Sequence, residues 1–169
     1  MIDKRKATLS ALVRFYDIGS LIAFLAMMGC IMIEVFSRNI IHLPTTWAEE
    51  ASRFFCVWTV FLGSAGAWYR GSHIVIHVLI SRLTGRAKLF LQIIVEILTA
   101  IFLVSVWFGA LFIMKINYPI KTTALEISIT YFYLGLFLGV SGIIVFHFNA
   151  MGETFRQLKG STASSGEKG

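Results

Sequence analysis

The stretch TTWAEEASRFFCVWTVFLGSAGAWYRGSHIVIHVL, residues 45–79, places charged residues at both ends of one apolar run. Two acids precede the run and an arginine lies near its start, and an arginine and two histidines follow it. The run itself covers residues 51–69, and a membrane-spanning helix needs about 20 predominantly apolar residues. The pattern therefore predicts a transmembrane helix whose two ends are marked by charge.

The whole chain has the composition of a membrane protein. Hydrophobic residues make up 57% of its 169 residues, charged residues make up 14%, and the mean hydropathy is +0.77. Soluble domains carry about 25% charged residues, so a soluble fold of this size would not bury so much apolar surface. Three further apolar runs, at 18–36, 89–114 and 127–148, are also long enough to cross a bilayer. We expect an all-α membrane protein with four transmembrane helices in a domain over residues 1–150, followed by a disordered cytoplasmic tail over residues 151–169.

Basic residues gather on one predicted side of the membrane. The N-terminal segment, the connection after the second run and the C-terminal tail contain Lys4, Arg5, Lys6, Arg14, Arg70, Arg82, Arg86, Lys88, Arg156, Lys159 and Lys168. Because such residues stay on the cytoplasmic side, both termini are expected to be cytoplasmic. The basicity of the chain then reflects its topology and predicts no nucleic-acid partner. The run at 18–36 exceeds the apolar core of a signal peptide, so we expect it to remain as an anchor.

The start of the second helix carries capping signals. Thr46 and Glu49 have the spacing of a capping box, in which each side chain bonds to a backbone N–H group of the other residue. Glu49 also lies one turn before Arg53, in the order that favours an ion pair. We therefore expect a short capped helix start at the outer surface. Glu50 has no assigned partner here, and either a partner helix or solvent would satisfy it.

Small residues recur at helical spacing in three of the runs. The pairs are Gly63 with Ala67, Ser105 with Gly109, and Gly135 with Gly139, and Gly142 extends the last of them. In a membrane, small residues allow helix backbones to approach closely. These faces either pack within the chain or receive another subunit, and the sequence leaves both open.

Two acids lie inside or at the edge of apolar runs. Glu96 lies within the third run, where an acid must face protein or water. The expected partners are Arg70, His73 and His77. Glu96 is interpreted as a neutralised or paired acid that anchors helices, with a proton or ion relay as the alternative. Glu34 lies near the outer end of the first run, and we expect it to pair with Arg38 one turn later.

The histidines permit a second type of site. His73 and His77 are four residues apart, and either of them could share a haem with His147 at the inner side of the membrane. The alternative is that these histidines form hydrogen bonds at the membrane boundary. The two cysteines, Cys30 and Cys56, lack the spacing of a metal or redox pair.

The sequence lacks the signatures of a complete pump or an enzyme. Its two prolines, Pro44 and Pro119, both fall in predicted outer connections, so no run has the interruption that marks many transporter substrate sites. It contains no phosphate-binding loop, nucleophile elbow or zinc-protease motif. We therefore expect a scaffold with no catalytic residue, cofactor or metal of its own.

The chain resembles the small membrane subunit of tripartite ATP-independent periplasmic (TRAP) transporters, the DctQ-type family. The residues that carry the resemblance are Trp47, Glu49, Glu50, Arg53, Trp58, Gly63, Ala65, Arg70, Gly71, His73 and Ile74. The chain length, the four runs and the stretch TTALEISITYFYLGLFLGV at 122–140 are also similar to the family. The resemblance covers nearly the whole chain, and its specific part is residues 47–79.

The resemblance implies a multi-pass protein of the bacterial inner membrane that braces a large membrane subunit. In such transporters the large subunit carries the sodium and substrate sites, and a periplasmic binding protein delivers a carboxylate such as a C4-dicarboxylate or sialic acid. The candidate partner-interface residues are then Trp47, Glu49, Glu50, Arg53, Trp58, Gly63, Ala67, Gly135, Gly139 and Gly142. A haem-binding anchor of a redox complex and a self-associating four-helix protein remain as alternatives.

Overall fold

The described part of the chain is almost entirely helical, as the sequence predicts. The computed structural model describes residues 2–43, 45–71 and 86–165. Its helices are α1 (Ile2–Phe36), α2 (Thr46–Gly71), α4 (Arg86–Asn117) and α5 (Thr130–Ser165), and a π-helical turn, η1 (Ser37–Ile41), continues α1.

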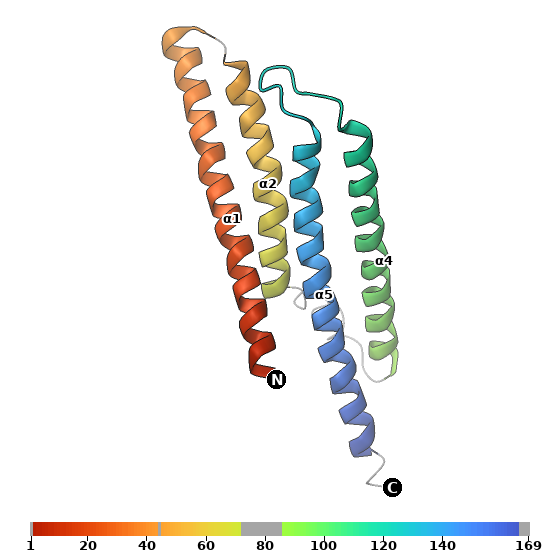
Figure 1. The fold of residues 1–169 in the computed structure, drawn as a ribbon. Coiled ribbons are helices and arrows are strands. Elements are labelled where there is room, and N and C mark those ends of the chain that lie inside the picture. The colour runs from red at the N-terminus through yellow and green to blue at the C-terminus, as the bar shows by residue number, and fades with distance from the viewer. Residues whose placement is uncertain (1, 44, 72–85, 166–169) are drawn as a thin grey trace.

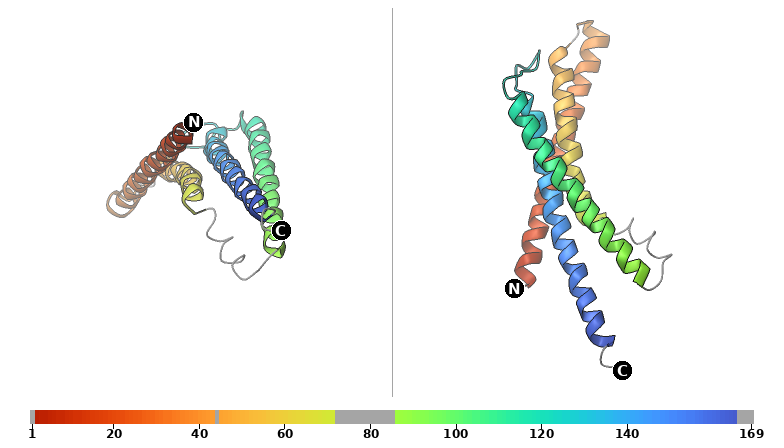
Figure 2. Two further views of the ribbon diagram at one scale, coloured as in Figure 1. Left: turned by 90° about the horizontal axis from the view of Figure 1, so that it is seen from below. Right: turned by 90° about the vertical axis from the view of Figure 1, so that its right-hand side faces the viewer.

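The helices form an open layer and not a closed bundle (Figure 1). α1 packs on α2, α2 packs on α5, and α5 packs on α4, so α1 and α4 are the two edges. The view from below in Figure 2 shows the same order across the molecule. The first residues of α1 and the last residues of α5 lie at one end, which we call the terminal end. The opposite end, with residues 42, 43, 45 and 118–129, is called the loop end.

Three of the described helices are long and apolar enough to cross a membrane. The candidate spans are Ala7–Ile40, Ile93–Asn117 and Thr130–Gly152. The sequence predicted a fourth span in α2, and this helix is long enough, with 26 residues and about 39 Å of helical rise. Small residues and charged ends lower its hydropathy, so length and composition alone do not identify it as a span.

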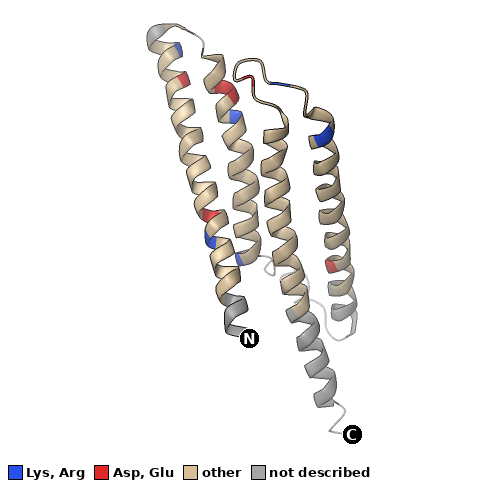
Figure 3. Cartoon of the chain, in the orientation of Figure 1, with Lys and Arg blue, Asp and Glu red and all other residues tan. Residues whose placement is uncertain are grey.

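Charge is confined to the two ends of the layer (Figure 3). Uncharged stretches separate Asp17 from Glu34 in α1, Arg53 from Arg70 in α2, and Glu96 from Lys115 in α4, and residues 130–152 of α5 also carry no Asp, Glu, Lys or Arg. An apolar band of this kind is the form that a bilayer core requires, because a charge at mid-membrane is costly.

Glycines allow α5 to approach its neighbours closely. A Cβ atom at Gly139 would lie 2.4 Å from the backbone oxygen of Phe61 on α2, so this position has no space for a side chain. A Cβ atom at Gly142 would lie 2.5 Å from the ring of Tyr16 on α1. The predicted small-residue face of the fourth run is therefore packed within the chain.

The same glycines expose backbone oxygens to side chains of other helices. Gly142 follows Leu138 by four residues, and the Tyr16 hydroxyl donates to the Leu138 oxygen at 2.9 Å. Gly135 follows Tyr131 by four residues, and Trp58 Nε1 donates to the Tyr131 oxygen at 3.1 Å. In each case a missing side chain at the following turn leaves the carbonyl group accessible.

Gly63 on α2 likewise leaves a backbone oxygen accessible to a side chain of α1. It follows Thr59 by four residues, and the Ser20 hydroxyl donates to the Thr59 oxygen at 3.0 Å. A Cβ atom at Gly63 would lie 2.9 Å from the Ser20 hydroxyl oxygen. Ala67, the predicted partner of Gly63, is exposed, so the two residues do not form one packing face within the chain.

α5 lies at the centre of the layer, and the edge helices present apolar surface. In the most apolar window of α5, 39% of the residues are buried, against 6% in α1 and 11% in α4. The core cluster consists of Val13, Tyr16, Leu62, Ala65, Leu103, Val140, Ile143 and Phe146. The outward faces of α1 and α4 are therefore left for lipid or another protein.

The fourth helix differs from its prediction at both ends. It begins at Thr130 and not at residue 127, because the chain just before it forms a hairpin, in which the Ile129 N–H donates to the Ile120 oxygen at 3.0 Å. It continues to Ser165, into the stretch 151–165 for which a disordered tail was expected.

The predicted ion pair between Glu34 and Arg38 is wrong. The structure describes both side chains, and its ion pairs join other residues. The α-helical geometry ends at Phe36, and Arg38 lies in the wider π-helical turn η1. Its side chain therefore no longer follows Glu34 by one α-helical turn.

Replacing Gly139 by alanine should destabilise the layer, because the added methyl group meets the backbone of α2 and cannot be accommodated by a side-chain rotation. The expected loss in the free energy of unfolding is about 1–3 kcal/mol, as for other over-packed sites. Gly109→Ala in α4 is the matched control, since a Cβ atom there has no neighbour within 4 Å. Unfolding of the two purified variants in mild detergent measures the free energy of unfolding of each. Equal stability of the two variants would contradict the close approach.

Candidate functional site

The start of α2 differs in detail from the predicted capping box. Thr45 precedes the helix, and its backbone oxygen accepts the N–H groups of Ala48 at 3.1 Å and Glu49 at 3.4 Å. The capping box on Thr46 is therefore wrong, because Thr46 is already the first helical residue. Glu49 instead pairs with Arg53 one turn later, and this ion pair was predicted.

Glu50 anchors α2 to the connection between α4 and α5. Its Oε1 accepts the N–H groups of Thr123 and Ala124, both at 3.1 Å. Its Oε2 accepts the N–H groups of Ala124 and Leu125, both at 3.0 Å. One carboxylate therefore bonds three successive backbone amides that lie more than 70 residues further along the chain. We call this arrangement the Glu50 anchor.

The connection that receives Glu50 is a small hairpin over residues 120–129. Lys121 and Ser128 form an isolated antiparallel bridge, and the Thr122 N–H donates to the Ile127 oxygen at 2.9 Å. Glu126 has a φ of 52°, in the left-handed region, which closes the tip. Successive N–H groups that converge in a turn form an anion-binding concavity. Here the anion is a side chain of the same protein.

The environment of Glu50 favours its ionised form. The backbone N–H of Leu125, followed by those of Ala124 and Thr123, lowers the pKa of the Glu50 carboxyl below its usual value of 4.5, and desolvation opposes this shift in part. Hydrogen bonds to the charged form stabilise that form. Glu50 therefore carries its charge at neutral pH and holds the hairpin as a carboxylate.

Aromatic contacts continue the junction of α2 and α5 below the Glu50 anchor. The rings of Phe54 and Phe132 pack edge to face, with their centroids 5.2 Å apart. Trp58 packs against Gly135, where a Cβ atom would lie 3.1 Å from the indole ring. Trp58 is thus a contact between helices of one chain, in addition to any role at a partner interface.

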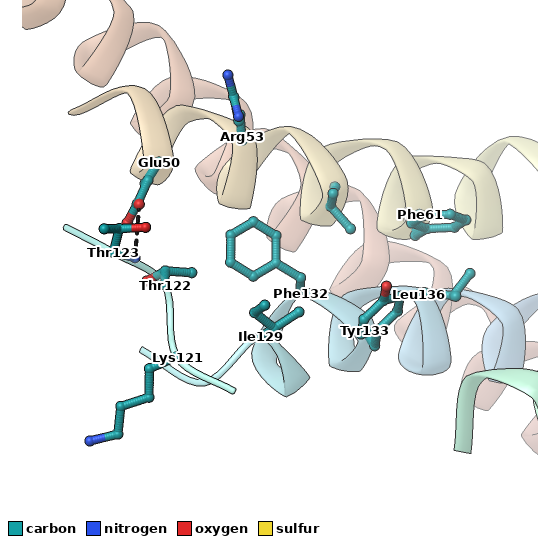
Figure 4. Close-up of a pocket in the computed structure, with 11 residues that line it drawn as sticks. Glu50, Arg53, Phe61, Lys121, Thr122, Thr123, Ile129, Phe132, Tyr133 and Leu136 are labelled. Carbon is teal, nitrogen blue, oxygen red and sulfur yellow. Dashed lines mark hydrogen bonds between the residues drawn. The ribbon is translucent and has the colours of Figure 1, made fainter. Parts of the chain in front are cut away.

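A cavity of about 560 Å³ lies beside the Glu50 anchor, between α2, α5 and the hairpin (Figure 4). Much of its lining is apolar and includes Val57, Phe61, Phe132 and Leu136. The basic residues Arg53 and Lys121 also line it. Figure 4 shows Glu50 directed at Thr123, away from the apolar side chains. The cavity thus combines apolar side chains with Glu50 and two basic residues.

An ion pair joins α1 to α2 near the terminal end. Arg70 donates to both carboxylate oxygens of Asp17, with nitrogen–oxygen distances of 2.6 and 3.0 Å. A Cβ atom at Gly66 would lie 2.2 Å from Asp17 Oδ1, so this glycine makes room for the acid. The prediction that Arg70 pairs with Glu96 is wrong, because both terminal nitrogens of Arg70 bond Asp17.

Asp17 was missed in the sequence, although a signal was present. It directly precedes the first apolar run, at the membrane level predicted for Arg70. An acid and a base at the same depth of neighbouring spans are natural partners, since each neutralises the other at the membrane boundary.

Glu96 is buried, with 6% of its surface exposed, at the junction of α4 with α5. His147 is 7% exposed, and its Nε2 lies 3.3 Å from the backbone oxygen of Glu96. The predicted partners His73 and His77 lie outside the described residues, as does Ile74. The haem pair that would combine one of them with His147 therefore stays a prediction.

The remaining predicted residues occupy varied positions. Trp47 is 44% exposed at the loop end, and the Glu49–Arg53 pair is exposed beside it. Ala65 is fully buried. Gly71 ends α2 and has open space around it. Among the described residues, no group of three His, Cys, Asp or Glu side chains could hold a metal ion.

Comparison with known proteins identifies a transporter family. The family described as "Tripartite ATP-independent periplasmic transporters, DctQ component" matches residues 27–157. The protein "Sialic acid TRAP transporter permease protein SiaT" of Haemophilus influenzae (strain 86-028NP) is 27% identical over 75 residues. This alignment covers 44% of the present chain and 12% of SiaT, so the chain spans a small part of that relative's length.

Glu50→Gln should loosen the hairpin, because an amide side chain has one acceptor oxygen and no charge, whereas the carboxylate accepts from three N–H groups. Hydrogen exchange at Thr123, Ala124 and Leu125 is expected to become several-fold faster. Glu49→Gln is the matched control, since Glu49 pairs only with the exposed Arg53 in the structure. Unchanged exchange in the Glu50 variant would contradict the anchor.

The Glu50 anchor should also make the stability of the folded chain depend on pH. The lowered pKa means that the anchor stabilises the folded chain fully above about pH 4.5, and that this stabilisation is lost as the pH falls through the lower pKa of the folded state. The amide chemical shifts of residues 123–125 should therefore titrate with a midpoint below 4.5. A midpoint at or above 4.5, or the same titration in Glu50→Gln, would be the contrary result.

Proposed function

Since this chain belongs to the DctQ component family of tripartite ATP-independent periplasmic transporters, whose members are non-enzymatic transport subunits, we propose that it braces a separate large membrane subunit. In this role the chain carries no substrate site. It supplies a rigid layer of membrane helices against which the large subunit is held.

The observation that carries the proposal is that the polar groups of the layer hold its own helices together. Glu50 binds the hairpin, Arg70 binds Asp17, and Trp107 Nε1 donates to Ser141 at 3.0 Å between α4 and α5. A protein that moved a charged substrate through itself would need polar groups directed into a path. This arrangement supports the proposal that the chain acts as a scaffold.

The outward faces of the edge helices are the proposed contact surfaces for the large subunit. α1 and α4 bury little of their span within the chain, although both are strongly apolar. The same partner would contact the loop end, at Trp47, the Glu49–Arg53 pair and Lys121 beside the cavity.

The proposed orientation places the terminal end in the cytoplasm and the loop end in the periplasm. Arg14, in the first half of α1, and Arg70, in the last turn of α2, belong to the terminal end, where α1 begins and α5 ends (Figure 1). With α2 as the fourth span, this is the arrangement that the positive-inside rule predicts for the bacterial inner membrane.

The proposed cargo is a carboxylate, such as a C4-dicarboxylate or sialic acid, which a periplasmic binding protein delivers. Sodium would bind to the large subunit. The similarity to SiaT, a sialic acid transporter permease by name, supports this class of substrate.

Affinity purification of the tagged chain from its native membrane, with mass spectrometry and an absorption spectrum, tests the proposal. A stoichiometric large polytopic partner is expected, without a haem band. Deletion of the chain should then abolish sodium-dependent uptake of the carboxylate, and the intact gene should restore it. A coloured complex with a flavin or iron–sulfur subunit would instead identify a redox anchor that uses His147, and recovery of the chain alone as an oligomer would identify a self-associating protein.

A further inference from the structure

His147 on α5 contacts two polar residues of neighbouring helices near the terminal end. They are Trp68 on α2, through its ring, and Glu96 on α4, through its backbone oxygen. Glu96 and His147 are among the few buried polar residues of the described chain, and both fall inside candidate membrane spans. The three residues are called the inner polar cluster.

His147 contacts both other members of the inner polar cluster. Its ring packs against the indole of Trp68, with centroids 5.9 Å apart and planes inclined by 67°. Its Nε2 lies 3.3 Å from the Glu96 backbone oxygen, and a carbonyl oxygen only accepts, so Nε2 is the protonated nitrogen in this contact. The Nε2 proton is thus directed at the main chain and not at the Glu96 carboxyl group.

Two buried atoms of the cluster have no hydrogen-bond partner among the described protein groups. They are Trp68 Nε1, which can only donate, and Glu96 Oε2, which belongs to a carboxyl group. Buried polar atoms in proteins are nearly always paired, either with protein or with an ordered water molecule. A ligand beside the His147 ring would accept a hydrogen bond from the indole N–H and form a second one with the carboxyl oxygen. It must therefore be able both to accept and to donate hydrogen bonds.

We propose that the inner polar cluster is a hydration site, in which one water molecule accepts the Trp68 Nε1 proton and hydrogen-bonds Glu96 Oε2 beside the His147 ring. Water can accept from the indole N–H and can bond a carboxyl oxygen in either protonation state, because it both donates and accepts hydrogen bonds. The ion pairs of the described residues do not include Glu96, so no Lys or Arg of that part supplies the missing bond.

The proposed water molecule connects the two helices that flank α5. α2 and α4 each pack against α5. A bond from Trp68 through water to Glu96 would therefore bridge α2 to α4 directly. This role does not depend on the proposed function of the chain.

The first test uses the unmodified chain, labelled with ¹⁵N-tryptophan and embedded in lipid nanodiscs. The Trp68 indole proton should show cross-relaxation with a bound water molecule. Trp107 is the internal control, because its Nε1 already donates to the Ser141 hydroxyl at 3.0 Å. Cross-relaxation to protein protons alone at Trp68 would overturn the proposal.

The second test is a double-mutant cycle with Trp68→Phe and Glu96→Leu, read as the midpoint of thermal unfolding. If one water molecule joins the two residues, the double variant should lose no more than the more damaging single variant. The control cycle combines Glu96→Leu with Trp107→Phe and should be additive. Additive losses in the Trp68 cycle would overturn the proposal, and if the variants do not fold, the cross-relaxation measurement on the unmodified chain decides the question.

Discussion

The close approach of helix backbones at glycine is the constraint on which the rest of this structure depends. Gly63, Gly135 and Gly142 each lie four residues after a carbonyl group that receives a hydrogen bond from another helix. Since lipid is as apolar as leucine, helices in a membrane gain little from burying apolar side chains. Close backbone contact combined with side chain–carbonyl bonds supplies the attraction instead.

Polar contacts complete this packing at the two ends of the layer. The Glu50 anchor joins α2 to the hairpin before α5, and the Arg70–Asp17 pair joins α2 to α1. α2 is therefore held at both ends by charge and along its length by backbone contact. α2, the least apolar of the described helices, therefore has the most contacts with its neighbours. This is consistent with its low content of apolar residues that could face lipid.

Most of the fold could be predicted from the sequence, but few of its polar contacts could. Apolar runs determine where helices lie, because the bilayer thickness limits their length. The Glu49–Arg53 pair was predictable since both residues lie on one helix. The partner of Glu50 and the Asp17–Arg70 pair were not, because they join segments that only the three-dimensional packing brings together. Thr46 failed as a cap because the helix begins one residue earlier than the capping box requires, so Thr46 is already helical.

The Glu50 anchor has a consequence for sequence variation in the hairpin. Glu50 binds the backbone amides of residues 123–125, and these amides are present whatever side chains the three positions carry, proline excepted. The hairpin can therefore exchange its side chains, and with them the surface that it shows to other proteins, while its attachment to α2 stays the same. The single acidic side chain at position 50 has no such freedom.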